Sequence, residues 1–281
     1  MRQNGPMLMG IEREAVEQWV REHVADLTPP FDWERLVGGH SNLTYRVVDR
    51  NGTVAVIRRP PLGQLLPKAH DMNREFRIIS ALWGTGVPVP RPYGYCADTE
   101  VTGAAFYVMG FVEGEPLGGA ADAETWLPEG ARRSVSESFA DTMAALHLVD
   151  PIERGIGDLG RHDDFAGRQL KAWYGSWVSS AADAEFDDPR VHAMHDFLST
   201  HKPPDGTVRL VHGDFGVHNC LVVPEGRISA VLDWEVASLG DPLSDLAYLL
   251  NMWVEPGEDF RDDGMTAKPG FLSRAELVAR Y

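Results

Sequence analysis

The sequence has little cysteine, a shortage of basic side chains and no long apolar run, and each shortage excludes a class of protein. Its 281 residues include only Cys96 and Cys220, too few for a disulfide framework and too far apart for a zinc site. No apolar stretch reaches the roughly 18 to 20 residues that a membrane-spanning helix needs. A net charge of −16 argues against binding nucleic acid or anionic lipid through a basic surface.

The N-terminus also lacks the features of a targeting segment. Residues 1–10 contain one arginine and no apolar stretch of signal-peptide length, so the default expectation is a cytoplasmic protein. The hydrophobic content of 43% is enough to build a core, which predicts a globular enzyme. The acidic surface would suit a cationic substrate, although solubility alone is the favoured explanation.

The first part of the chain predicts an antiparallel sheet flanked by helices. Apolar residues recur at helical spacing from Ile11 to Val24 and again over residues 72–82. Two β-rich runs, residues 43–48 and 53–57, are separated by the hairpin signal Asp-Arg-Asn-Gly. A further buried strand is expected over residues 105–112, before a break at 113–116.

The second part of the chain is mainly helical. Helical stripes run through residues 139–147 and 165–177, and a third, apolar helix is expected over residues 242–253. Short strands are predicted over residues 208–211, 219–223 and 228–232, and residues 273–276 form a capping box. We therefore predict an α+β fold with a small N-terminal lobe, 1–112, and a larger helical C-terminal lobe, 113–281, whose last helix looks cut short at Tyr281.

One run of residues carries most of the chemistry: Val-His-Gly-Asp-Phe-Gly-Val-His-Asn over residues 211–219, followed by Asp233. Phosphoryl transfer needs a carboxylate to orient the attacking hydroxyl and oxygen ligands to hold Mg²⁺ against the phosphates. Asp214, Asn219 and Asp233 can supply that set. The spacing from Asp214 to Asn219 equals that of the kinase catalytic loop H-R-D-x-x-x-x-N, with Gly213 in place of the arginine.

Three ordered motifs, residues 212–219, 232–235 and 240–247, resemble those of the aminoglycoside phosphotransferase and choline kinase superfamily. The resemblance implies a two-lobed, protein-kinase-like fold and the use of ATP with Mg²⁺. It further implies that Asp214 is the catalytic base, that Asn219 and Asp233 bind magnesium, and that Asp245 braces the catalytic loop.

The resemblance also assigns roles in the N-terminal lobe. Residues 37–45 look like the loop that covers the nucleotide, with Gly38, Gly39, Ser41 and Asn42 near the phosphates. Glu75 matches the helix glutamate that pairs with the phosphate-contacting lysine in kinases, although an ordinary solvated helix residue is an equally good interpretation. Met109 lies in the segment expected to bind the adenine edge.

The position expected to carry that lysine is Arg58, at the end of the run Ala-Val-Ile-Arg. Arginine can still neutralise phosphate charge, and its planar fork can bind in a bidentate way, but it is not interchangeable with lysine. An arginine-rich strand end is similar to the phosphotransferase branch associated with acyl-CoA dehydrogenases. The acceptor stays open between an aminoglycoside, an amino alcohol and a hydroxyacyl-CoA.

Two other functions remain to be weighed. His212, Asp214 and His218 could form the metal site of a hydrolase, although nothing downstream supplies a further histidine cluster. A catalytically weak pseudokinase or nucleotide-binding regulatory module is the second, motivated by Arg58 and the early C-terminus. The aromatic stripe of Trp173, Tyr174 and Trp177 could line an acceptor cleft, but burial in the core is the favoured interpretation.

Overall fold

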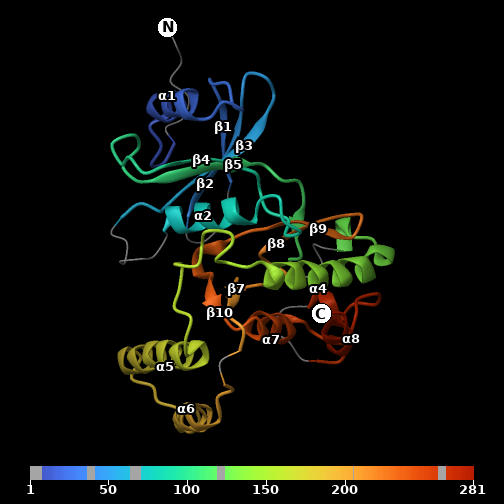
Figure 1. The fold of residues 1–281 in the computed structure, drawn as a ribbon. Coiled ribbons are helices and arrows are strands. Elements are labelled where there is room, and N and C mark those ends of the chain that lie inside the picture. Colours follow the sequence, from blue (N-terminus) through green and yellow to red (C-terminus); the bar gives the residue numbers. More distant parts are fainter. Residues whose placement is uncertain (1–7, 37–41, 64–70, 119–123, 205, 259–263) are drawn as a thin grey trace.

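A five-stranded antiparallel sheet forms the N-terminal lobe of the computed structural model, which describes residues 8–36, 42–63, 71–118, 124–204, 206–258 and 264–281 (Figure 1). The strand order is β1-β2-β3-β5-β4. The predicted hairpin is confirmed, because β2 and β3 pair with Leu43 opposite Arg59. The strands are β1 (Asp32–Leu36), β2 (Leu43–Val48), β3 (Val54–Arg59), β4 (Pro92–Cys96) and β5 (Phe106–Gly110).

Helices α1 (Arg13–His23) and α2 (Met72–Leu82) cover opposite faces of this sheet (Figure 1). Successive residues of a strand point to opposite faces. Ala55 and Ile57 accordingly pack in the cluster that contains α1, whereas Val56 packs in the cluster that contains α2. The same alternation directs Arg58 towards α2, which sets up the ion pair described below.

Helix α2 links the two lobes. Its N-cap is Asp71, whose side chain accepts a hydrogen bond from the backbone N–H of Arg74. Its apolar face, which includes Ile78 and Leu82, belongs to one hydrophobic cluster together with Phe139 of the C-terminal lobe. The sheet and the C-terminal lobe are therefore joined through a continuous core.

The C-terminal lobe is mainly helical, as predicted. Among the described residues, no helix is both long enough and apolar enough to cross a bilayer. The predicted break after β5 contains a two-residue strand, β6, which pairs with β8; the lobe boundary at residue 112 stays a prediction. The elements are β6 (Glu115–Pro116), η1 (Glu129–Ala131), α4 (Arg132–Leu148), α5 (Phe165–Asp183), α6 (Pro189–His201), β7 (Arg209–Val211), β8 (Cys220–Val223), β9 (Arg227–Val231), η2 (Trp234–Val236), β10 (Ser238–Gly240), α7 (Leu243–Met252), η3 (Met265–Ala267) and α8 (Arg274–Arg280).

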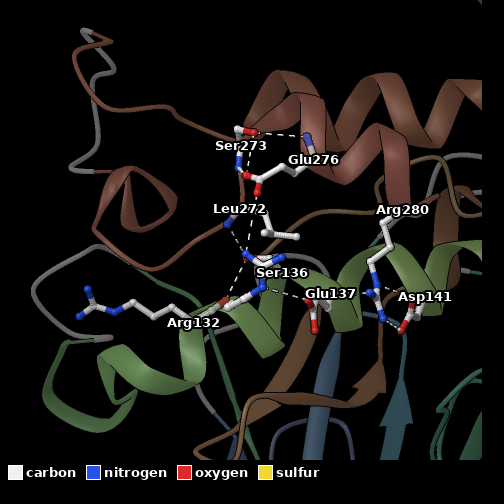
Figure 2. A network of polar contacts seen from close by, with 9 residues as sticks. Arg132, Ser136, Glu137, Asp141, Leu272, Ser273, Glu276 and Arg280 are labelled. Carbon is white, nitrogen blue, oxygen red and sulfur yellow. Dashed lines mark hydrogen bonds and ion pairs between the residues drawn. The ribbon is translucent and has the colours of Figure 1, made fainter.

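Helix α8 is fastened to α4 by polar contacts (Figure 2). The predicted capping box is present: the Ser273 hydroxyl accepts from the Glu276 backbone N–H, and the Glu276 carboxylate accepts from the Ser273 N–H. At the other end, Arg280 donates to both oxygens of Asp141 at 2.8 Å. Between them, the buried Ser136 hydroxyl accepts from the backbone N–H of Leu272 at 3.1 Å.

Helices α5 and α6 stand apart from the sheet, at the lower end of the molecule in Figure 1. Neither helix contains a fully buried residue. Trp173 is 72% exposed, and Tyr174 and Trp177 are only half-buried. The expectation that this aromatic stripe lies in the core is therefore wrong: only α6 lies against it among the described elements, where Tyr174 stacks on His195 and Trp177 contacts His192, and Trp173 stays open to solvent.

Candidate active site

The loop between β7 and β8, which the sequence predicts to be catalytic, is braced by α7. The fully buried carboxylate of Asp245 accepts hydrogen bonds from the backbone N–H groups of His212 at 2.7 Å and Gly213 at 2.8 Å. On its other side, Asp245 contacts Nε2 of His147 at 3.2 Å. Because a buried carboxylate needs such partners, Asp245 holds the loop backbone in one conformation.

Two features of the loop explain its sequence. Gly213 has a φ of 80°, and a Cβ there would lie 3.1 Å from the carbonyl oxygen of Val236, so a larger residue would be strained. The His212 ring is buried, with Nε2 2.8 Å from the carbonyl oxygen of Leu232 and Nδ1 accepting from the backbone N–H of Asp214. Burial lowers the pKa of His212, so the imidazole stays neutral and structural.

The Asp214 carboxylate is held by side chains from three places. Nδ2 of Asn219 donates to its Oδ2 at 2.9 Å, Nε2 of His218 lies 3.3 Å away, and Tyr248 of α7 adds a hydrogen bond. Burial would raise the pKa of Asp214, but these hydrogen bonds outweigh it and hold the pKa at about 2. Burial and the bond to Asp214 raise the pKa of Tyr248 to about 12. Asp214 is therefore an ionised, oriented carboxylate.

Asn219 and Asp233 offer oxygen ligands beside this carboxylate. The Nδ2 atom of Asn219 is committed to the backbone and side chain of Asp214, so its amide oxygen is the atom suited to a cation. Asp233 has a left-handed backbone, φ 64°, which aspartate tolerates better than most residues. One amide oxygen and one carboxylate fit Mg²⁺, which is commonly held by few protein ligands together with phosphates and water.

Arg58 joins the two lobes through carboxylates. Its Nη2 lies 2.6 Å from Oδ1 of Asp233, and its Nε lies 3.4 Å from Oε2 of Glu75. Glu75 is buried and also accepts a hydrogen bond from the Tyr107 hydroxyl at 3.0 Å. Burial raises the pKa of Glu75 to about 7, more than Arg58 and Tyr107 lower it. Of the two interpretations of Glu75, the solvated helix residue is wrong and the partner of Arg58 is what the structure contains.

Asp214 also lines a cleft of about 980 Å³. Helix α5 supplies one wall, through Phe165, Ala172 and Trp173, and α7 supplies the opposite wall, through Leu243 and Tyr248. Asp214 lines this cleft and is hydrogen-bonded to Asn219, whose backbone carbonyl accepts from Leu232, the residue before Asp233.

The hydrolase alternative gains no support. The His212 ring is committed to the Leu232 carbonyl, so it does not converge on a site with Asp214 and His218. In the part of the chain that the structure describes, no group of three or more histidine, cysteine or acidic residues could hold a metal ion.

Several predicted site residues are untested. Gly38, Gly39 and Ser41 lie outside the described residues, and Asn42 is half-buried just before β2. Met109 lies inside β5, paired with Val56 on one side and Pro92 on the other, so its expected contact with adenine stays a prediction.

The sequence interpretation missed three polar partners. Tyr248 and His218 hold Asp214, but the first lies in an apolar helix and the second was considered only as a metal ligand. Tyr107, which binds Glu75, belongs to a strand that looked uniformly apolar. The available signal was a tyrosine hydroxyl within an apolar segment, because a buried hydroxyl needs a hydrogen-bond partner.

Comparison with known proteins agrees with this geometry. The model of the phosphotransferase enzyme family matches residues 32–277. Acyl-CoA dehydrogenase family member 11 of Gallus gallus is 36% identical over 255 residues, which cover 86% of this chain and 31% of that protein. Family member 10 of Mus musculus is 31% identical over 286 residues, covering 97% of this chain and 26% of that protein. The chain thus spans less than a third of these two relatives.

Solved structures give the same answer. A crystal structure from Ralstonia eutropha, described as a candidate aminoglycoside phosphotransferase, is 30% identical with a TM-score of 0.76 and covers 95% of this chain and 78% of that chain. The streptomycin-ATP complex of APH(2")-IIa, at 15% identity and a TM-score of 0.64 over 98% of this chain and 85% of that one, shares the fold. The chain therefore belongs to the phosphotransferase enzyme family, and its structure has the two-lobed, kinase-like fold of aminoglycoside phosphotransferases.

Proposed function

We propose that the protein transfers the γ-phosphoryl group of ATP, with Mg²⁺, to a hydroxyl of a small molecule. The observation that carries the proposal is that Asp214 both lines the cleft and is hydrogen-bonded to Asn219, which with Asp233 would supply the oxygen ligands. A hydroxyl in the cleft and a phosphate near Asp233 would meet at this carboxylate. Positioning and electrostatic stabilisation supply most of the catalysis in such reactions.

Each residue has a part in this proposal. Asp214 would orient the acceptor hydroxyl and take its proton, and Tyr248 and His218 would keep that carboxylate in place. Asn219 and Asp233 would hold Mg²⁺, whose charge neutralises the phosphates during transfer. Arg58 would contact the phosphates from the N-terminal lobe. Solved relatives bound to ATP or ADP support the use of a nucleotide by this fold.

The walls of the cleft favour an acceptor with an apolar part. Phe165, Ala172, Trp173 and Leu243 present hydrocarbon beside the hydroxyl position. Among the described residues that line the cleft, the acidic ones are Asp214, Asp245, which is committed to the loop backbone, and Asp241. A polycationic aminoglycoside would find few counter-charges there. Hydroxyacyl thioesters fit better, and the names of the curated relatives point to acyl-CoA chemistry.

The test is an ADP-release assay with Mg·ATP over hydroxyacyl-CoA thioesters, amino alcohols, sugars and cationic antibiotics. We expect acceptor-dependent ADP release, strongest with the hydroxyacyl thioesters, and a phosphorylated product by mass spectrometry. Strongest turnover with the antibiotics would contradict the apolar acceptor. Nucleotide binding without transfer to any class would instead support a regulatory module.

A further inference from the structure

The carboxylate of Asp233, which is proposed to hold a metal ion, is already paired with the guanidinium of Arg58. Nη2 of Arg58 lies 2.6 Å from Oδ1 of Asp233, which is the distance of a short charge-assisted hydrogen bond. The Arg58 side chain is 12% exposed and that of Asp233 is 32% exposed, so the pair lies at the edge of the site. A divalent ion bound at Asp233 would therefore lie close to the positive charge of Arg58.

The charge on Arg58 is permanent. Burial lowers its pKa, but Tyr107, Glu75 and Asp233 outweigh burial, and the pKa ends above its ordinary value. A guanidinium cannot lose its proton in a protein, so it repels a second cation at any working pH. Only movement of the side chain can relieve this repulsion.

The two carboxylates that pair with Arg58, those of Glu75 and Asp233, differ in how firmly they are held. Glu75 is buried, bonded to Tyr107, and carried by α2. Asp233 is more exposed and starts the short helix η2 from a left-handed backbone. Arg58 can thus keep its Glu75 contact while Nη2 leaves Asp233.

We propose that Arg58 takes the place of a divalent cation at Asp233 in the nucleotide-free protein. Phosphate oxygens of an arriving nucleotide would accept the guanidinium and release Asp233 for the metal. Metal and nucleotide would then bind with positive coupling. The nucleotide phosphates would draw the Arg58 charge away from the metal site, and the metal would take the place of Arg58 at Asp233. This inference rests on the proposed function, since it uses Asp233 as the metal ligand.

The test measures Mn²⁺ binding, with free Mn²⁺ followed by electron paramagnetic resonance, in the presence and absence of ADP. We expect the nucleotide-free wild type to bind Mn²⁺ weakly and ADP to increase its affinity. In Arg58→Gln, which removes the charge, nucleotide-free Mn²⁺ affinity should rise about tenfold or more. The factor by which ADP increases that affinity should shrink, and ADP itself should bind more weakly.

Two further variants make the test decisive. Arg91→Gln removes an arginine from the exposed pair with Asp26, at 3.0 Å, and should bind Mn²⁺ as the wild type does. If Arg58→Gln fails to melt cooperatively, Arg58→Lys replaces it. Lysine keeps the charge but lacks the planar fork that reaches both carboxylates, so a smaller rise is expected.

The possible outcomes distinguish failure of the Arg58 role from failure of the proposed phosphotransferase function. Equal nucleotide-free Mn²⁺ affinity and equal coupling in wild type and Arg58 variants would overturn the role of Arg58 while leaving the metal site in place. Failure of the wild type to bind Mn²⁺ even with saturating ADP would overturn the proposed function, and this inference with it.

Discussion

Asp214 is the residue on which the proposed chemistry depends most directly. Asp214→Asn removes the negative charge but keeps the shape, so it should lower turnover by roughly 10² to 10⁴-fold while nucleotide binding stays close to wild type. Steady-state ADP release and ADP titration calorimetry measure the two effects. Asp241→Asn is the matched control, because Asp241 lines the same cleft but accepts from the backbone N–H of Leu243. Equal losses in both variants would remove the special role of Asp214.

Glu75 should make stability depend on pH. The pKa of Glu75 is about 7 in the folded protein, against an ordinary value of 4.5 for a solvated glutamate in the unfolded chain. Between these two pH values the folded state therefore binds more protons than the unfolded state. The free energy of unfolding should therefore fall as pH rises from 4.5 to 7, by at most about 3 kcal/mol. Denaturant unfolding across this range should show that contribution in the wild type and lose it in Glu75→Gln. Parallel curves for the two proteins would contradict the raised pKa.

At the residue scale, the sequence predicts partners within one short motif better than partners far apart in the chain. Asp214 and Asn219 could be placed because five-residue spacing in one loop keeps both side chains at one end of it. Tyr248, which completes the setting of Asp214, lies 34 positions later and has no spacing rule to mark it. Which hydroxyl meets which carboxylate is decided by packing.

At the scale of single elements, the contribution of the Ser273 N-cap of α8 to stability can be measured directly. Ser273→Ala removes the hydroxyl that accepts from the Glu276 N–H at 3.2 Å, and loss of an N-cap of this kind typically costs about 1 kcal/mol. Chemical denaturation should show that loss. Ser199→Ala is the control, because Ser199 is exposed on α6 and its hydroxyl bonds only within its own helix among the contacts described. That variant should stay within about 0.5 kcal/mol of wild type.

Elements were predictable where one periodic pattern carried the signal. Helix α2 spans Met72–Leu82, the stretch whose apolar residues recur at helical spacing, and the β2–β3 hairpin follows from its turn sequence. Helix α5 exists as predicted, but its aromatic stripe does not lie in the core. Periodicity shows that one face of a helix is apolar, whereas only the tertiary arrangement decides what covers that face.

For the whole molecule, the arginines of α2 fasten the lobes together. Arg74 donates to the carbonyl oxygen of Ala237, and Arg77 donates to Asp158 at 3.0 Å and to the carbonyl oxygen of Gly155 at 3.1 Å. Arg74→Met should lower the free energy of unfolding by about 1 to 2 kcal/mol. It should also speed amide hydrogen exchange over residues 234–237, next to Asp233.

Arg77→Met is the comparison for that variant. Its contacts lie on a segment away from Asp233, so exchange over residues 234–237 should stay at the wild-type rate even if stability falls. Faster exchange of that segment in both variants would mean that general loosening, not the Arg74 contact, controls the segment.

Contacts across the whole molecule are the least predictable from sequence. Arg58 and Asp233 are 175 positions apart, and their pairing depends on how the β3 face, α2 and the catalytic lobe pack. The motif resemblance placed both residues near the phosphates but did not predict that they touch. Gly38, Gly39 and Ser41 stay predictions, because their positions lie outside the described residues.

The exposure of Trp173 gives the cleft an optical reporter. Of the eight tryptophans, Trp173 is 72% exposed and Trp83 is 47% exposed, whereas Trp234 and Trp253 are fully buried. An acceptor that fills the cleft would shield Trp173 from water and from collisional quenchers such as iodide. Binding could then be followed as a blue shift in emission without any turnover, and Trp83→Phe would remove the competing exposed signal.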